Sequence, residues 1–434
     1  MRLHSTKNPA TDVSFEQAVM KGLPDDNGLF MPKSLPRLPE EFFEQIEQYS
    51  IAEIAYEVTK ALLGDEIPPE VLQKICEEGM DFDAPVVSLS KQYHSLELFH
   101  GPTLAFKDFG ARFMARCMSY FMRNASQPLR ILVATSGDTG GAVGHGFLGV
   151  PNIEVTILYP KGKVSKLQEL QLTTLGQNVS AIEIDGTFDD CQRLVKSAFL
   201  DADLQKALKL TSANSINISR LVPQSFYYFY AYAQLKNLGR PLVFSVPSGN
   251  FGNLCGGLIA WKMGLPISYY LAATNSNRVF TDYWHTGNFE PKPSVRTVSN
   301  AMDVGNPSNF PRTLALFGES YEDLKGQLGS YSFDDEQTVE GMKELKEQYG
   351  YVADPHGAIG YLALKEFFKE QKVPSAMGVF LETAHPAKFL DVVEEALGEK
   401  QPLPPALASL VDKEKVSISM PNDFGRFKEY LLGL

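Results

Sequence analysis

One stretch of the chain decides the fold, Leu242-Val-Phe-Ser-Val-Pro-Ser-Gly-Asn-Phe-Gly-Asn-Leu254. Its pattern predicts a buried strand over Leu242–Val246, a tight loop, and a helix that begins near Asn253. Glycines let the backbone approach a ligand, and the free N–H groups and positive dipole end of the following helix attract an anion. The stretch therefore predicts a phosphate-binding loop, although it lacks the Gly-Lys-Ser/Thr ending of a nucleotide P-loop. A plain strand-to-helix turn is the alternative.

Short apolar runs alternate with helical patterns on both sides of this stretch. The predicted strands are Ile131–Thr135, Val155–Tyr159, Val179–Ile184, Leu242–Val246, Ser268–Ala273 and Met377–Leu381. The predicted helices between them are Ala142–Leu148, Ser165–Leu175, Phe188–Leu200, Ser219–Leu238 and Leu254–Met263. This alternation predicts an α/β fold with mainly parallel sheets covered by helices, which binds ligands in the loops at the carboxyl ends of its strands.

The first part of the chain, residues 1–94, predicts a helical region. Ser14 is a candidate cap for a helix over Phe15–Met20, and helices are expected over Glu40–Leu63 and Pro69–Glu78. We expect the chemistry in residues 95–434. The segment from Pro402 to the end of the chain is expected to be a surface extension.

Composition narrows the classes of function. The 434 residues are enough to build two or three domains. The 40 basic and 52 acidic residues give a net charge of −12, which argues against nucleic acid or an anionic membrane as a partner. The uncharged run Pro241–Trp261 is long enough to cross a bilayer, but its polar centre argues against a membrane span. The four cysteines form no CxxC and the seven histidines no HxxxH, so we expect no metal site and a reducing, cytoplasmic location.

A lysine in an apolar setting is the second chemical signal. Lys107 lies between Ala105-Phe106 and Phe109, and such surroundings favour the neutral amine that covalent carbonyl chemistry needs. An ordinary lysine that is paired with Asp108 or another acid is the alternative, and local physics alone favours it. A lysine able to form a Schiff base, together with a phosphate-binding loop, indicates a pyridoxal phosphate enzyme.

Several long motifs, in order along almost the whole chain, resemble those of the threonine synthases. They are His100-Gly-Pro-Thr-Leu-Ala-Phe-Lys-Asp-Phe-Gly110, Thr135-Ser-Gly-Asp-Thr-Gly140, Asn214-Ser-Ile-Asn-Ile-Ser-Arg220, Ser245-Val-Pro-Ser-Gly-Asn-Phe-Gly-Asn253 and Thr383-Ala-His-Pro-Ala-Lys-Phe389. Gly28-Leu-Phe-Met-Pro32 and Asn300-Ala-Met-Asp-Val304 are similar too. The match is to the longer class, which has an N-terminal helical region.

The resemblance implies a fold type II pyridoxal phosphate enzyme that converts O-phospho-L-homoserine and water into L-threonine and phosphate. It implies two α/β lobes within residues 95–434, with the cofactor in the cleft between them, and suggests a monomer. Lys107 would hold the cofactor, and Thr383 would face its pyridine nitrogen. The residues expected to bind the cofactor phosphate are Gly249, Asn250, Phe251, Gly252 and Asn253.

The same resemblance assigns the substrate site. Ser136, Asp138 and Thr139 match the loop that covers substrate and cofactor, and Ser215, Asn217 and Arg220 match the motif that grips the leaving phosphate. Arginine suits that role because its planar fork binds phosphate oxygens in pairs; a surface charge is the alternative for Arg220.

Two positions depart from related enzymes. Asp138 stands where many fold type II enzymes have asparagine, and Glu382 stands where the relatives have glycine. We expect the Glu382 side chain to point away from the cofactor ring. Three other functions stay open: another fold type II enzyme such as a serine or threonine dehydratase, a non-catalytic ligand-binding homologue, and a nucleotide-binding protein.

Overall fold

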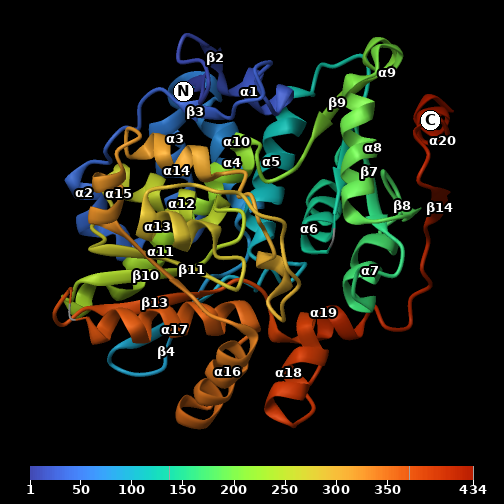
Figure 1. The fold of residues 1–434 in the computed structure, drawn as a ribbon. Coiled ribbons are helices and arrows are strands. Elements are labelled where there is room, and N and C mark those ends of the chain that lie inside the picture. The colour runs from blue at the N-terminus through green and yellow to red at the C-terminus, as the bar shows by residue number, and fades with distance from the viewer. Residues whose placement is uncertain (136, 371, 434) are drawn as a thin grey trace.

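The computed structural model describes residues 1–135, 137–370 and 372–433. Within them the chain builds a six-stranded sheet, a five-stranded sheet and a small three-stranded sheet (Figure 1). Helices cover both faces of the two larger sheets, as the alternation of strands and helices predicts. The α/β class with mainly parallel sheets is therefore confirmed.

The six-stranded sheet has the order β12-β11-β10-β13-β5-β4 and is parallel except at β4, which runs antiparallel to β5. Side chains of β10 alternate between its faces, since Phe244 packs in the core shared with α11 and α12 while the Ser245 hydroxyl donates to the Gly360 carbonyl of α17 at 2.7 Å. The strands and these helices are β4 (Val86–Ser88), β5 (Tyr93–Glu97), β10 (Leu242–Pro247), β11 (Tyr269–Thr274), β12 (Leu328–Ser332), β13 (Met377–Glu382), α11 (Phe226–Leu235), α12 (Gly252–Lys262) and α17 (Pro355–Lys369).

The five-stranded sheet has the order β14-β8-β7-β6-β9 and is parallel throughout. One face packs on α8 and α20, and alternate residues on the other face join the core that contains α5 and α6. The elements are β6 (Leu129–Ala134), β7 (Ile153–Pro160), β8 (Val179–Asp185), β9 (Lys209–Ser212), β14 (Ile418–Pro421), α5 (Lys107–Phe121), α6 (Asp138–Phe147), α7 (Lys166–Thr173), α8 (Phe188–Leu200) and α20 (Phe424–Gly433).

The N-terminal region is only partly helical. Ser14 caps α1 with a full capping box, as predicted, but an antiparallel sheet of order β2-β1-β3 accompanies the helices. The expectation of a purely helical region was therefore incomplete. Its elements are β1 (Arg2–Ser5), β2 (Val13–Ser14), β3 (Phe30–Pro32), α1 (Phe15–Lys21), α2 (Glu40–Gln45), α3 (Ile51–Leu63) and α4 (Pro69–Gly79).

The remaining helices lie mainly in the connections. They are α9 (Ala202–Ala207), α10 (Ile218–Leu221), α13 (Val279–Thr286), α14 (Phe310–Leu316), α15 (Tyr321–Gln327), α16 (Asp335–Tyr349), α18 (Leu390–Leu397) and α19 (Pro405–Ala408). Single 3-10 turns are η1 (Ile46–Gln48), η2 (Gly64–Glu66), η3 (Val222–Ser225), η4 (Lys236–Leu238), η5 (Asn300–Met302) and η6 (Pro386–Phe389).

All six predicted strands are confirmed, with ends that differ by at most two residues. The helix predicted over Ser219–Leu238 is instead divided into α10, η3, α11 and η4. The first break lies at Pro223, which has no N–H for a continuous helix. The expected surface extension after Pro402 was wrong. Its β14 pairs with β8, and Phe427 and Leu431 of α20 are fully buried.

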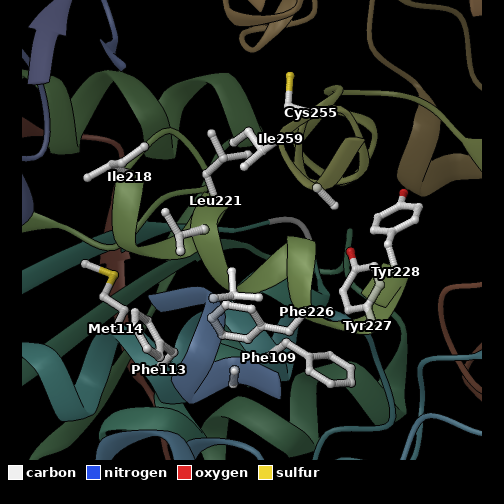
Figure 2. Close-up of a cluster of buried hydrophobic side chains, with 14 of the residues drawn as sticks. Phe109, Phe113, Met114, Ile218, Leu221, Phe226, Tyr227, Tyr228, Cys255 and Ile259 are labelled. Carbon is white, nitrogen blue, oxygen red and sulfur yellow. The ribbon is translucent and has the colours of Figure 1, made fainter. Parts of the chain in front are cut away.

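A buried apolar cluster holds together the helices that carry the site (Figure 2). Phe109 and Phe113 of α5 pack edge-on against Tyr227 and Phe226 of α11, and Ile259 of α12 belongs to the same cluster. The helix that begins at Lys107 is thereby fixed relative to α12, the helix that begins at the glycine-rich loop.

Candidate active site

Lys107 is the first residue of α5, and the chain before it is bonded to the end of β13. The Phe106 N–H donates to the Thr383 carbonyl at 2.9 Å, and the His385 N–H donates to the Leu104 carbonyl at 3.0 Å. Leu104 has a positive φ of 58°, a strained conformation that is concentrated at functional sites. The lysine and Thr383 are thus carried by two segments that are bonded to each other.

The surroundings of Lys107 favour its neutral amine. Desolvation lowers the pKa of Lys107, and Arg220 and Lys388 lower it further against the opposing charge of Asp138. Asp108 points elsewhere, since it accepts hydrogen bonds from the Thr103 N–H at 2.8 Å and the Thr103 hydroxyl at 2.6 Å. The alternative of an ordinary Lys107–Asp108 pair is therefore wrong.

A buried ion pair lies close to Lys107. Lys388 Nζ is 2.7 Å from Asp138 Oδ1, and both side chains are almost completely buried. The same oxygen accepts from Gln168 Nε2 at 2.9 Å, and Lys388 also donates to the Thr103 carbonyl at 2.7 Å. Burial opposes the charge of Asp138, but Lys388 and Lys107 hold its pKa below the usual value. Because Asp138 follows β6 and Lys388 follows β13, the pair joins the two large sheets.

The glycine-rich loop has the form of an anion cradle. It leads from β10 into α12, whose first turn contains no acidic residue. Phe251 stands before the helix with a positive φ of 64°. A Cβ on Gly249 would lie 2.7 Å from the Met302 Cα, so only glycine allows η5 to pack here. The N-terminal amides of α12 are therefore presented within a tightly packed loop.

Neighbouring side chains fix this cradle. Asn250 Nδ2 donates to Ser215 Oγ at 3.1 Å, which brings two residues of the predicted site together. Asn253 Oδ1 accepts from the hydroxyls of Tyr227 and Tyr228, both at 2.7 Å.

Arg220 is buried, with 2% of its surface exposed, so the surface-charge alternative is wrong. Its Nη1 donates to the Ala213 carbonyl at 2.6 Å, and a Cβ on Gly110 of α5 would lie 3.2 Å from its Nε. Burial lowers the pKa of Arg220 to about 10. No carboxylate among the described residues forms an ion pair with it. A buried guanidinium without such a partner is suited to binding an anion.

Comparisons with known proteins agree with this geometry. Residues 88–381 match the model of the pyridoxal-phosphate dependent enzymes, residues 2–80 that of the threonine synthase N terminus, and residues 357–431 that of the threonine synthase C-terminal region. Threonine synthase of Escherichia coli (strain K12) is 47% identical over 100% of this chain and 99% of its own length. The chain belongs to the threonine synthase family.

Solved structures of the family share the whole fold. The crystal structure of threonine synthase from Escherichia coli has a TM-score of 0.91 at 46% identity and covers 100% of both chains. The threonine synthase from Brucella melitensis, whose structure is described as PLP bound, has a TM-score of 0.94 at 34% identity and covers 100% of this chain and 99% of its own. The protein is therefore a fold type II, pyridoxal phosphate-dependent lyase.

The residues present fit pyridoxal phosphate. Around the cradle, Gln224 Oε1 and Asn253 Nδ2 are buried without a hydrogen-bond partner among the described residues. Unsatisfied buried polar atoms are rare in native proteins and point to a ligand. Together with the α12 amides and the amine of Lys107, they supply the phosphate-binding and covalent contacts that the cofactor requires.

The structure assembles most of the predicted residues. Lys107, Asp138, Arg220, Thr383 and the 249–253 cradle lie on segments that contact one another, and Thr139 follows Asp138 at the start of α6. Ser136 lies outside the described residues. The Asn217 side chain forms other hydrogen bonds. Its amide group donates to the Val19 carbonyl at 2.9 Å, and its oxygen caps α10.

Sequence reasoning missed two buried cations. Lys388 lies in the motif Thr383–Phe389 and has no role among those that the resemblance implies, although it pairs with Asp138. Arg312 is fully buried and bonds to the carbonyls of Phe30 and Ile216 and to Asn309 Oδ1. The signal was available in both cases, because a lysine or arginine among apolar neighbours needs a buried partner.

Proposed function

We propose that the protein converts O-phospho-L-homoserine and water into L-threonine and inorganic phosphate at the site around Lys107. The observation that carries this proposal is the position of Lys107 at the start of α5. There its pKa is lowered by burial, and the unpaired cation of Arg220 lies nearby. The reaction requires both a reactive amine and a binding site for a phosphate ester.

Lys107, Thr383 and the cradle form the proposed cofactor site. The backbone N–H groups of Gly249 to Asn253 bind the cofactor phosphate, aided by the positive end of α12. Thr383, which is 8% exposed, would place its hydroxyl at the pyridine nitrogen. Lys107 would provide the covalent link, which the lowered pKa of its amine favours.

When bound, pyridoxal phosphate supplies an electron sink for charge that develops on the amino acid. Lys107 then acts as the base and acid that moves protons at the substrate Cα and Cβ. Burial first, and then the charges of Arg220 and Lys388, lower the pKa of Lys107 and so favour the neutral amine that can accept a proton.

The substrate is held by residues from both sheets. Arg220 and Ser215 bind the leaving phosphate, and Asn217 supports them by capping α10, the helix that carries Arg220. Ser136, Asp138 and Thr139 are the residues proposed to cover the substrate, and Asp138 and Thr139 stand at the start of α6. Asp138 takes part as a pair with Lys388, so this side of the site has no net charge from these two groups.

The four cysteines of the chain are buried and free, and burial raises the thiol pKa of each. This supports a location in the cytoplasm, where thiols stay reduced. Among the described residues no helix is long and apolar enough to span a bilayer, and no cluster of His, Cys, Asp or Glu could hold a metal. We propose a monomer, which sedimentation analysis would test.

The decisive experiment mixes the purified protein with pyridoxal phosphate and O-phospho-L-homoserine and measures phosphate and threonine together. Equal amounts of both products support the proposal. A serine or threonine dehydratase would instead release ammonia from serine or threonine without forming phosphate. A non-catalytic homologue would bind the cofactor and form neither product.

A further inference from the structure

A pair of carboxyl groups is buried directly behind Thr383. Glu382, the last residue of β13, and Asp354, which precedes α17, are both completely buried. The Asp354 N–H donates to Glu382 Oε1 at 2.5 Å. Glu382 Oε2 and Asp354 Oδ2 are both buried without a hydrogen-bond partner among the described residues. Two buried carboxyls whose charges repel each other cannot both be ionised at acceptable cost, so this pair holds a proton.

The proton belongs on Glu382 because the two carboxyls have different donors. Asp354 Oδ1 accepts from the backbone N–H groups of His356 and Gly357, at 2.5 Å and 3.0 Å, at the positive end of the 15-residue helix α17. These contacts stabilise an anion on Asp354. Glu382 receives a single backbone N–H, and its neighbour in register across the sheet is another carboxylate, Glu97 of β5. Burial first, and then Asp354, raise the pKa of Glu382.

The Glu382 carboxyl packs directly against Gly357 in the first turn of α17. A Cβ on Gly357 would lie 1.6 Å from Glu382 Oε2, so any larger residue at position 357 would displace the carboxyl. Glycine in the first turn of a helix weakens the helix, and here it is needed for close packing.

The pair is connected to both ends of the proposed cofactor site. On one side Glu382 adjoins Thr383, whose carbonyl holds the segment that leads into Lys107. On the other side Asp354 Oδ1 is 2.9 Å from His356 Nδ1, and His356 Nε2 accepts from the Ala301 N–H at 3.2 Å. This acceptor role places the ring proton of a neutral His356 on Nδ1, where it is donated to Asp354. Ala301 belongs to η5, which packs on Gly249 of the cradle.

We propose that Glu382 carries the proton of this buried acid pair and is a positioning residue that holds the strand end bearing Thr383 against η5, the turn over the phosphate cradle. The positioning role rests on the proposed function, whereas the location of the proton does not. The titratable groups that face the pair are Glu97, Tyr351, His356 and His385. Two more charged groups lie one step away, Asp303 next to His356 and Lys388 next to His385.

The first test measures the stability of the apoprotein against pH for the wild type and Glu382→Gln. Glutamine keeps the acceptor for the Asp354 N–H and replaces the acid proton with a permanent N–H. The folded protein holds the Glu382 proton more tightly than the unfolded chain does. The stability that this proton contributes is complete below the pKa of glutamate in the unfolded chain. It is lost as the pH rises toward the higher pKa in the folded protein. Above about pH 5 the wild-type ratio of folded to unfolded protein should therefore fall, relative to Glu382→Gln, by about tenfold per pH unit.

A matched control makes the same change at Glu344, whose carboxylate pairs with Lys365 of α17. Above about pH 6, where ordinary carboxyls are ionised, Glu344→Gln should run parallel to the wild type. A wild-type curve that is also parallel to Glu382→Gln would overturn the assignment of the proton.

A second measurement needs no variant. With glutamate labelled at its carboxyl carbon, a signal in the protonated range should persist at neutral pH in the wild-type apoprotein. Among the glutamates of the described residues, Glu382 is the one whose pKa is raised. If every glutamate signal lies in the ionised range at neutral pH, the proposal fails.

The positioning role is tested by binding of pyridoxal phosphate to the apoprotein. Glu382→Ala, which removes the buried hydrogen bond, should weaken binding roughly tenfold, and Glu382→Gln should restore it. Unchanged affinity in Glu382→Ala would overturn the positioning role. The stability and labelling experiments do not depend on the threonine synthase assay. The proposed function and the location of the proton on Glu382 can therefore fail separately.

Discussion

At the scale of single residues, the lowered pKa of Lys107 depends first on its burial and then on the charges of Asp138, Arg220 and Lys388. We predict that Lys107→Ala abolishes covalent attachment of the cofactor and activity but leaves the fold intact, since the side chain forms no ion pair among the described residues. Borohydride reduction followed by peptide mapping checks this, with Lys388→Arg as the control that retains Lys107. Labelling of a different lysine in the native protein would contradict the assignment.

Thr383 is proposed to face the ring nitrogen of the cofactor, and its hydroxyl would then set whether that nitrogen is protonated. A hydroxyl cannot hold that nitrogen protonated as a carboxylate would. We predict that Thr383→Asp protonates the ring and shifts the absorption spectrum of the bound cofactor, with Thr383→Ser as the conservative control. Native spectra and rate in Thr383→Asp would mean that residue 383 does not face the nitrogen.

Arg220 is expected to give the site its preference for phosphate, because the net charge of −12 repels a dianion. A charge-assisted hydrogen bond contributes about 1.5–3 kcal/mol, so Arg220→Ala should weaken phosphate-bearing ligands by about one to two decades. Turnover should fall further if the same contacts stabilise the departing phosphate. Measuring O-phospho-L-homoserine against an uncharged homoserine ester provides the control. An equal loss for both substrates, or none, would exclude Arg220 as the phosphate site.

At the scale of elements, α17 and β13 are matched to each other at Gly357 and Glu382. We predict that Gly357→Ala destabilises the protein by about 1–3 kcal/mol, because the added Cβ would overlap the completely buried Glu382 carboxyl. In a Glu382→Gly background the same change should cost less, so a double-mutant cycle measured by denaturant unfolding should show coupling of at least about 1 kcal/mol. Additive effects would show that the two positions are independent.

Elements with a strong local pattern could be predicted from sequence, and those defined by distant partners could not. Long apolar strands such as β7 and β10 and the Ser14 cap were recognisable because their signals are local. β14 is four residues long and pairs with β8 across more than 200 positions, so nothing local distinguishes it from a surface segment. Pro223 is a local signal for a break in the helix, but the apolar pattern on both sides of it predicts one continuous helix.

At the scale of the whole molecule, the site is built from segments that are far apart in sequence. Motif resemblance identified Lys107, Arg220 and Thr383, because each lies in a recognisable run of residues. Which residues pair across the site depends on how the two sheets are placed, and no local pattern encodes that placement. The Asp138–Lys388 ion pair, which joins residues 250 positions apart, and the Glu382–Asp354 carboxyl pair were therefore visible only in the structure.

The Asp138–Lys388 pair links the two large sheets, so its loss should affect the stability of the whole molecule. Lys388→Met leaves Asp138 buried without its main cation and should lower the free energy of unfolding by about 3–5 kcal/mol at neutral pH. The pKa of Asp138 is lower in the folded protein than in the unfolded chain. The stability that ionised Asp138 contributes is therefore present above its pKa in the unfolded chain. It is lost as the pH falls through its pKa in the folded protein. The deficit of Lys388→Met should therefore shrink below about pH 4, where Asp138 can take up a proton.

Two controls accompany this prediction, both measured by denaturant unfolding between acidic and neutral pH. Lys415→Met breaks a partly exposed pair with Glu169 and Glu183 and should cost about 1 kcal/mol or less. Adding Asp138→Asn to Lys388→Met replaces the unpaired charge with a neutral amide, which Gln168 can still contact, and should recover most of the lost stability. If the Lys388→Met deficit is the same at every pH, or if Asp138→Asn recovers nothing, the cost comes from lost packing of the lysine chain and not from an unpaired carboxylate between the sheets.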